Sequence, residues 1–118
     1  MKTYPLFLDG EWVESGPFQA VINPANGETI AQVSTVDRAR VRGAIGDAHT
    51  AFESWRKLPG KARGGFLHAI ADEIEKRADD LARTITLENG KSLAQSKGEI
   101  GMTVDHLRWF AEEARRAY

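Results

Sequence analysis

The chain is patterned in two different ways along its length. In the first third, short apolar stretches are separated by turn-forming residues, whereas further on apolar residues recur three and four positions apart. Short apolar runs between turn residues are typical of strands, and the longer period is typical of helices that bury one face. The pattern therefore predicts strands within residues 1–34 and helices within residues 35–118.

Two β-hairpins are expected in the strand-like part, and each is marked by its turn. Asp9-Gly10 is a two-residue turn signal, because both positions of such a turn favour residues that adopt positive φ. Residues 23–27 (Asn-Pro-Ala-Asn-Gly) form a longer turn-forming cluster. The expected strand pairs are residues 6–8 with 11–13, and residues 18–22 with 29–33.

The first predicted helix follows Ser34-Thr35. Thr35 is a candidate N-cap, and Asp37 would then lie in the first turn, where a carboxylate is favourable. One apolar stripe runs along this helix and contains Val41, Ala44, Ala48, Phe52 and Trp55. The Leu58-Pro59-Gly60 segment ends the helix, because proline and glycine do not continue it.

A second and a third helix are expected between this break and Asn89-Gly90. The second begins near Lys61, and Asn89-Gly90 ends the third, since glycine is the usual residue just beyond a helix C-terminus. The inner face of the second is expected to contain Phe66, Leu67, Ile70 and Ile74, and that of the third Leu81 and Ile85.

The last predicted helix opens with a capping box. Ser92-Leu93-Ala94-Gln95 has the S-x-x-Q form in which the two side chains satisfy backbone N–H groups reciprocally. The inner stripe of this helix is Ile100, Thr103, Val104, Leu107, Phe110, Ala111 and Ala114. Nothing in residues 108–118 breaks the helix, so it is expected to be still running at Tyr118, as in a chain that is cut within a helix. The sequence therefore predicts an α+β segment of two β-hairpins followed by about four helices.

Composition narrows the class of protein. The chain has 118 residues, of which 42% are hydrophobic, and its 16 basic and 17 acidic residues nearly balance. A nucleic-acid-binding surface needs a clustered basic excess, so this balance argues against one. No apolar run approaches the roughly 20 residues of a membrane span, and residues 1–8 lack the apolar core of a signal peptide. The expected location is the cytoplasm.

Candidate catalytic residues are few. The chain contains no cysteine, which excludes disulfides, thiolate metal sites and a cysteine nucleophile within it. His49, His68 and His106 are too widely spaced for a zinc motif. Asp105-His106 with Ser96 has the residue types of a hydrolytic triad, but Ser96 lacks the G-x-S-x-G context of an exposed nucleophile.

Glycines gather at two places, and they bear on two questions: whether the chain has a phosphate-binding loop and where helices approach closely. Gly60, Gly64 and Gly65 follow a helix rather than a strand and lack the G-K-[ST] ending, so they indicate a helix junction rather than a phosphate loop. Gly98 and Gly101 lie in the last predicted helix, where glycines three apart would let another backbone approach closely. The residues alone therefore identify no catalytic constellation.

A series of short motifs, in order along the whole chain, is more specific than any one of them. The motifs are LDGEWV at 8–13, INPANGE at 22–28, Ala51-Phe52 with Trp55, Pro59 and Arg63, LENGKSL at 87–93, KGEI at 97–100, and WFAEEA at 109–114. This series resembles the opening of the aldehyde dehydrogenase superfamily, with Ser92 in place of the usual proline. The last two motifs are similar to the succinate-semialdehyde dehydrogenase branch.

The resemblance implies the NAD(P)-dependent oxidation of an aldehyde, such as a small semialdehyde, to an acid. In this family a cysteine thiolate attacks the aldehyde, hydride passes to the nicotinamide, and a glutamate-activated water releases the acid. An asparagine and a backbone N–H stabilise the oxyanion. All these residues and the main dinucleotide contacts follow the segment matched here. Residues 1–118 would then be the N-terminal part of the cofactor-binding domain of a longer protein, without its catalytic domain, inactive alone and without bound NAD or NADP.

Two further expectations rest on the same resemblance. Some members bind a structural monovalent cation through a backbone carbonyl before the NP turn and an acidic residue before NGK, which correspond to Ile22 and Glu88. The alternative is a Glu88 that is simply exposed at a helix end. Met102 matches a position that can border the substrate tunnel, and His106 lies one helical turn further on. A core methionine would look the same in sequence.

The expected partners are the remainder of the enzyme and its sister subunits. A severed segment would expose apolar stripes that once met the rest of the protein, so the isolated chain is expected to self-associate. The alternative is a free-standing assembly or interaction module that reuses this segment without chemistry and binds no nucleotide. A cooperative melt of a well-behaved species would favour that alternative.

Overall fold

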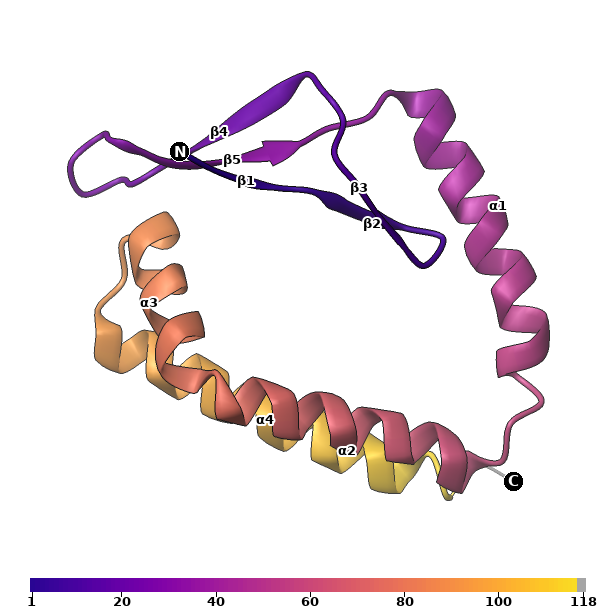
Figure 1. The fold of residues 1–118 in the computed structure, drawn as a ribbon. Coiled ribbons are helices and arrows are strands. Elements are labelled where there is room, and N and C mark those ends of the chain that lie inside the picture. The colour runs from indigo at the N-terminus through magenta and orange to yellow at the C-terminus, as the bar shows by residue number, and fades with distance from the viewer. Residues whose placement is uncertain (117–118) are drawn as a thin grey trace. The chain divides into compact units, whose positions relative to one another are not determined.

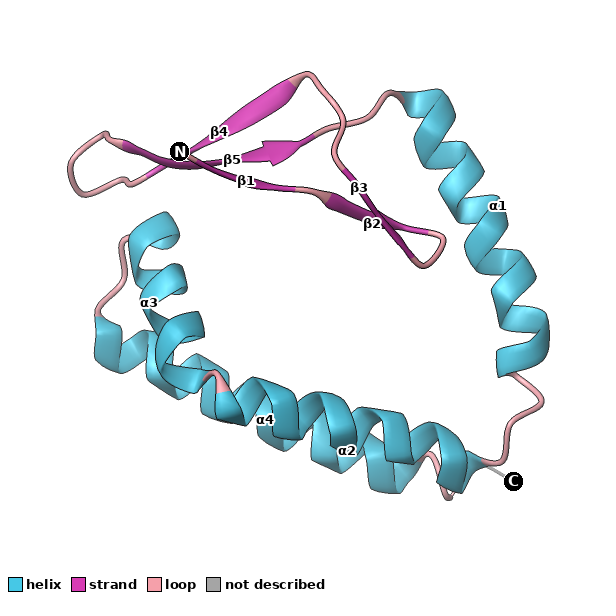
Figure 2. Cartoon of the chain, viewed as in Figure 1, coloured by secondary structure: helices cyan, strands magenta, loops and turns pink. Residues whose placement is uncertain are grey.

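The computed structural model of the protein describes residues 1–116. The chain forms two compact units, Met1–Lys57 and Leu58–Tyr118, and each is described by itself (Figure 1). Of the elements formed by residues 1–116, the five strands and one helix lie in the first unit, and the other three helices lie in the second (Figure 2). The predicted α+β segment is therefore confirmed. No helix within the described residues is long and apolar enough to cross a membrane.

Five strands make two small sheets in the first unit. They are β1 (Lys2–Tyr4), β2 (Leu6–Leu8), β3 (Glu11–Val13), β4 (Phe18–Ile22) and β5 (Thr29–Ser34). β2 pairs with β3, and β4 pairs with β5, both antiparallel, so the two predicted hairpin pairings are confirmed. β1 was not predicted, and it pairs in parallel with β5, which lies at the centre of a β1-β5-β4 sheet. Its three residues have no alternating apolar pattern, and its partner is distant in sequence.

Local turn chemistry explains the two antiparallel pairs. Asp9 and Gly10 have φ of 50° and 81°, the positive values that a two-residue hairpin turn requires. Phe7 and Trp12 are cross-strand partners, and their ring centroids lie 4.9 Å apart. In the longer turn, the Asn23 Oδ1 accepts a hydrogen bond of 2.9 Å from the Ala25 N–H.

The first helix, α1 (Arg38–Trp55), begins two residues later than the predicted cap implied. Asp37 is the N-cap, and its carboxylate accepts a 2.8 Å hydrogen bond from the Arg40 N–H. The expectation that Thr35 is the cap was wrong, because its hydroxyl instead donates to the Pro17 carbonyl. None of the residues of α1 is buried, and Ile45 of this helix is 64% exposed.

The second unit consists of α2 (Gly60–Lys76), α3 (Ala78–Asn89) and α4 (Leu93–Glu113). α4 packs along α2 and also against α3 (Figure 1). Gly90 ends α3 with a φ of 85°, as predicted. The capping box of α4 is confirmed, since the Ser92 Oγ accepts from the Gln95 N–H at 3.3 Å and the Gln95 Oε1 accepts from the Ser92 N–H at 3.3 Å.

The C-terminal end of α4 differs from the prediction. The helix ends at Glu113, and residues 114–116 form turns rather than a continuing helix. The Arg115 and Arg116 N–H groups bond to carbonyls three residues earlier, at 3.1 and 2.9 Å, which is the tightened geometry common where a helix stops. The expectation of a helix running to Tyr118 was therefore wrong at 114–116, and residues 117–118 lie outside the described part.

Small residues dominate the contact between the helices. The buried residues of the second unit are Gly64, Ala71, Ala82, Ser96, Ile100, Val104 and Ala111. A Cβ added at Gly60 or Gly64 would overlap the backbone carbonyl oxygen of Ala114 or Ala111, respectively. α2 and α4 thus approach through glycine, because any side chain there would separate the two backbones.

This observation corrects the assignment of the close approach. Gly98 and Gly101 were expected to admit another backbone, but a Cβ at either would meet nothing within 4 Å. Gly60 and Gly64, interpreted from sequence as a helix junction, are the positions in close contact. Both pairs have helical spacing, and only the packing distinguishes them.

Ion pairs at exposed positions join α4 to α2 and to α3. The Arg108 guanidinium reaches Asp72 at 3.1 Å and Glu75 at 2.7 Å, and the Lys97 ammonium reaches Asp79 at 2.8 Å. The Lys97 hydrogen bond lowers the pKa of Asp79 below its usual value. Exposed pairs of this kind contribute little to stability because water screens the charges, so apolar packing and the glycine contacts hold the helices together.

Candidate functional site

Met102 and His106, which the sequence placed at a substrate tunnel, share one exposed face of α4. The residues along this face are Met102, Asp105, His106, Trp109 and Phe110. Met102 is 54% exposed and Trp109 is 65% exposed. About 610 Å³ of open space lies against the face, a volume in the range of small-molecule sites. Every lining residue comes from one helix, however, so no second wall within the described unit encloses a ligand there.

Met102 does not belong to the core of the second unit. The buried side of α4 contains Ile100 and Val104, and residue 102 is rotated by about 200° from residue 100 around the helix. The alternative of a core-packing Met102 is therefore not what this unit shows.

The candidate triad is not assembled. Ser96 is fully buried, and its hydroxyl lies 2.9 Å from that of Thr86 on α3 and 3.2 Å from the Ser92 carbonyl oxygen. Ser96 and His106 are ten residues apart on one helix, or about 15 Å along its axis. The Ser96 hydroxyl is thus a structural group that joins α3 to α4.

The predicted cation ligands belong to different units. Ile22 is the last residue of β4, and the register of the β4–β5 pairing shifts between Val21 and Ile22. Glu88 lies in the last turn of α3. Both side chains are exposed, and no three His, Asp or Glu side chains cluster as metal ligands among the described residues. A cation would have to rely on carbonyl oxygens and one carboxylate. The site stays a prediction, which a melting temperature that depends on Na⁺ or K⁺ would support.

The three histidines also remain apart from any catalytic arrangement. His68 of α2 lies 2.9 Å from the Glu112 carboxylate of α4, and this hydrogen bond lowers the pKa of Glu112. His106 makes no hydrogen bond or ion pair within the described part of the chain. The contact between His68 and Glu112 therefore joins α2 to α4 and does not form a reaction centre.

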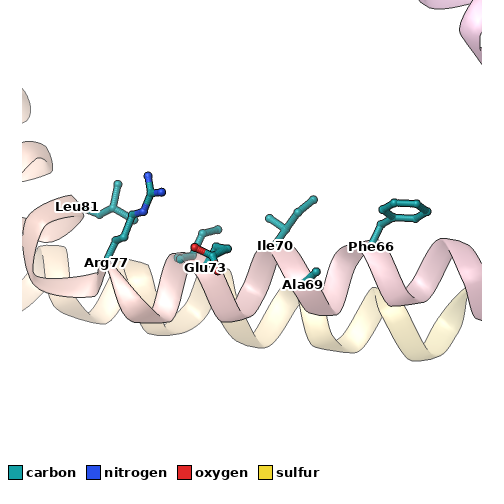
Figure 3. Close-up of a pocket in the computed structure, with 7 residues that line it drawn as sticks. Phe66, Ala69, Ile70, Glu73, Arg77 and Leu81 are labelled. Carbon is teal, nitrogen blue, oxygen red and sulfur yellow. The ribbon is translucent and has the colours of Figure 1, made fainter. Parts of the chain in front are cut away.

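A groove along α2 is the feature that sequence reasoning missed. It is lined by Phe66, Ala69, Ile70, Glu73, Ile74, Arg77 and Leu81 (Figure 3). Phe66, Ile70 and Ile74 recur every four residues and were predicted to face inward, yet Phe66 is 54% and Ile70 48% exposed. The side of α2 toward α4 instead carries Gly64 and Ala71. Periodicity correctly identified an apolar stripe but not which of two sides would be covered.

Comparison with known proteins supplies the family context. A sequence model described as the aldehyde dehydrogenase family matches residues 12–118. Glutarate-semialdehyde dehydrogenase of Pseudomonas aeruginosa is 43% identical over 114 residues, which are 95% of this chain and 24% of that protein. The NADP⁺-dependent succinate-semialdehyde dehydrogenase of Escherichia coli is 40% identical over 113 residues, or 94% of this chain and 23% of that protein.

A solved structure agrees with these sequence matches. Betaine aldehyde dehydrogenase of Staphylococcus aureus, in complex with NAD⁺, is similar with a TM-score of 0.90 and 36% identity. The match covers 94% of this chain and 23% of that chain. The chain thus spans about a quarter of the length of the proteins it matches.

Proposed function

Because the chain belongs to the aldehyde dehydrogenase family, we propose that it is the N-terminal part of the cofactor-binding domain of an NAD(P)-dependent enzyme that oxidises an aldehyde to a carboxylic acid. The observation that carries this proposal is a match over 95% of the chain to only 24% of a relative. A cytoplasmic location and an oligomeric enzyme belong to the same proposal.

The proposed substrate class is a small semialdehyde. Two similar relatives are named as dehydrogenases of glutarate and succinate semialdehyde. The KGEI and WFAEEA motifs at 97–100 and 109–114 favour the same branch. The cofactor, NAD or NADP, is proposed for the whole enzyme, since the named relatives and structures include both.

The chain by itself is proposed to be inactive. Aldehyde oxidation by this route requires a thiolate nucleophile, and the chain contains no cysteine. The titratable groups on the exposed face of α4, Asp105 and His106, have no such nucleophile beside them. We therefore expect no NADH when glutarate semialdehyde and NAD⁺ are added to the purified chain, as followed by absorbance; turnover there would contradict the proposal.

A chimaera tests the family role directly. This chain would replace the aligned N-terminal quarter of the P. aeruginosa enzyme, whose remaining part supplies the residues that follow. The expected result is an enzyme that reduces NAD⁺ or NADP⁺ with glutarate semialdehyde. A soluble or insoluble chimaera without turnover, beside an active parent enzyme, would count against the proposed function.

Met102 and His106 are proposed to border the substrate path in the whole enzyme. A Met102→Trp change in the chimaera adds bulk to an exposed face and is expected to raise the KM for the aldehyde several-fold, with a smaller change in kcat. Leu93→Trp, at another exposed apolar position of the same helix, is the matched control. Equal KM values for the two variants would remove Met102 from the path.

The remainder of the enzyme and sister subunits are the proposed partners. The apolar stripes of α1 and α2 remain exposed within their units, and such surfaces promote association. The isolated chain is expected to scatter light as a species larger than a monomer at micromolar concentration. A monodisperse monomer with a cooperative melt would favour the alternative, a non-catalytic assembly or interaction module.

A further inference from the structure

The groove on the second unit is an apolar surface with one charged end. Phe66 and Ile70 project from the side of α2 that points away from α4, and Leu81 extends the surface onto α3 (Figure 3). Among the described residues of this unit, α4 lies on the opposite side of α2 from Ile70 and does not cover it. Large apolar side chains gathered in this way on one face indicate an interaction surface.

The charged groups of the groove are not equivalent. Glu73 is paired with Lys76 at 2.7 Å, and that hydrogen bond lowers the pKa of the carboxyl group. The positive charge of Arg77 also lowers the pKa of Glu73, but Arg77 makes no side-chain hydrogen bond and no ion pair within 4 Å among the described residues. The groove therefore offers an apolar surface and, at the end near Leu81, a guanidinium whose N–H groups can donate to a carboxylate of a partner.

This asymmetry bears on which partner fits. In a symmetric contact between two copies, the groove would run antiparallel to itself. The carboxylate that the other copy's groove lining offers to Arg77 is that of Glu73, which is already paired with Lys76, and the remaining lining residues opposite Arg77 are apolar. Covering a charge with apolar groups is unfavourable unless the charge is paired. An apolar segment that carries an acidic residue at one end satisfies both parts of the groove, and a second copy does not.

The length of the related proteins points to the source of that segment. A relative with the same fold over this segment has about three-quarters of its length outside the match, because the match covers 23% of its chain. The inference rests on the proposed function, which makes this chain one part of such a protein.

We propose that the groove lined by α2 and α3 seats an apolar segment from the remaining three-quarters of an aldehyde dehydrogenase chain, with an acidic side chain of that segment against Arg77. The contact would cover Ile70, Ile74 and Leu81. It would also hold the N-terminal part in place on the rest of the enzyme.

Cysteine labelling tests the proposal, because the chain has no cysteine of its own. Ile70→Cys places a thiol in the groove, and Arg83→Cys is the control, since residue 83 is exposed on α3 and rotated by about 200° from Leu81. Each variant reacts with maleimide both as the free chain and within the chimaera, and the protein is then digested with trypsin. Mass spectrometry measures how fast the peptide that contains the introduced thiol becomes labelled. The thiol of the Ile70→Cys variant is expected to react at least about tenfold more slowly in the chimaera, whereas the thiol of the Arg83→Cys variant reacts at an unchanged rate.

Each outcome separates the inference from the function on which it rests. A chimaera with turnover, in which the thiol at position 70 reacts as fast as in the free chain, overturns the groove contact and leaves the proposed function standing. A chimaera without turnover overturns the proposed function and the inference together. Slow labelling of that thiol in a monomeric free chain would assign the groove to the first unit. Protection in the chimaera that disappears on dilution to single subunits would assign it to a second copy. Either result overturns the inference.

The acidic partner has its own readout. Arg77→Glu in the active chimaera is expected to lower the melting temperature more than Arg83→Glu, because it places a like charge against the proposed carboxylate. Equal melting temperatures for the two variants would remove the acidic residue from the proposal.

Discussion

Replacing Gly64 by alanine is expected to lower the free energy of unfolding of the second unit by about 1–3 kcal/mol. The new Cβ would overlap the carbonyl oxygen of Ala111, which is backbone and cannot rotate away as a side chain could. The two helices would have to separate, and contacts along the buried side of α4 would be lost. Urea unfolding of the chain, followed by far-ultraviolet circular dichroism, measures the change.

Gly65→Ala is the matched control one residue further on. A Cβ at Gly65 would meet nothing within 4 Å, so this variant should gain about 0.5–1 kcal/mol from the better helix propensity of alanine. The two substitutions are chemically identical and differ only in the neighbouring backbone. Equal stability of the two variants would show that α2 and α4 do not approach through Gly64.

The second large effect is expected from Ile100→Ala, at about 2–4 kcal/mol of destabilisation. Ile100 is 8% exposed and lies on the buried side of α4 with Val104, so truncation removes apolar contacts and leaves a cavity. The same urea unfolding experiment gives the value. The other buried residues of this unit are mostly small, so Ile100 supplies much of the buried apolar volume and its truncation should lower stability strongly.

Met102→Ala provides the comparison for this prediction. Met102 is on the same helix but 54% exposed, so its truncation should change stability by no more than about 0.5 kcal/mol. A loss as large as that of Ile100→Ala would place Met102 in the core and contradict the observed orientation of α4.

Elements fixed by local chemistry were predictable. Asp9-Gly10 formed its hairpin turn, Gly90 ended α3, and Ser92 with Gln95 capped α4, because each depends on a few neighbouring residues. The prediction failed where two local solutions competed. Thr35 and Asp37 are both good caps, and the Thr35 hydroxyl was already bonded to the Pro17 carbonyl, a contact that its immediate neighbours do not reveal.

In the candidate site too, features that depend on nearby residues were predictable, and burial against another helix was not. The motif series was enough to identify the family, because it needs only residue identity and order. That Met102 and His106 share a face followed from helical spacing. The burial of Ser96 did not follow, since whether a serine lies on the inside of a helix pair depends on which side the other helix occupies.

Residue order alone determined the succession of the four hairpin strands and the helices, most of their ends and the family, because these depend on backbone preferences and short motifs. Tertiary structure decided the parallel pairing of β1 with β5, the use of Gly60 and Gly64 as the contact between helices, and the outward direction of Phe66 and Ile70. Each of these joins residues that are distant in sequence. A stripe or a pair of glycines can serve on either side of a helix, and only the packed partner selects one.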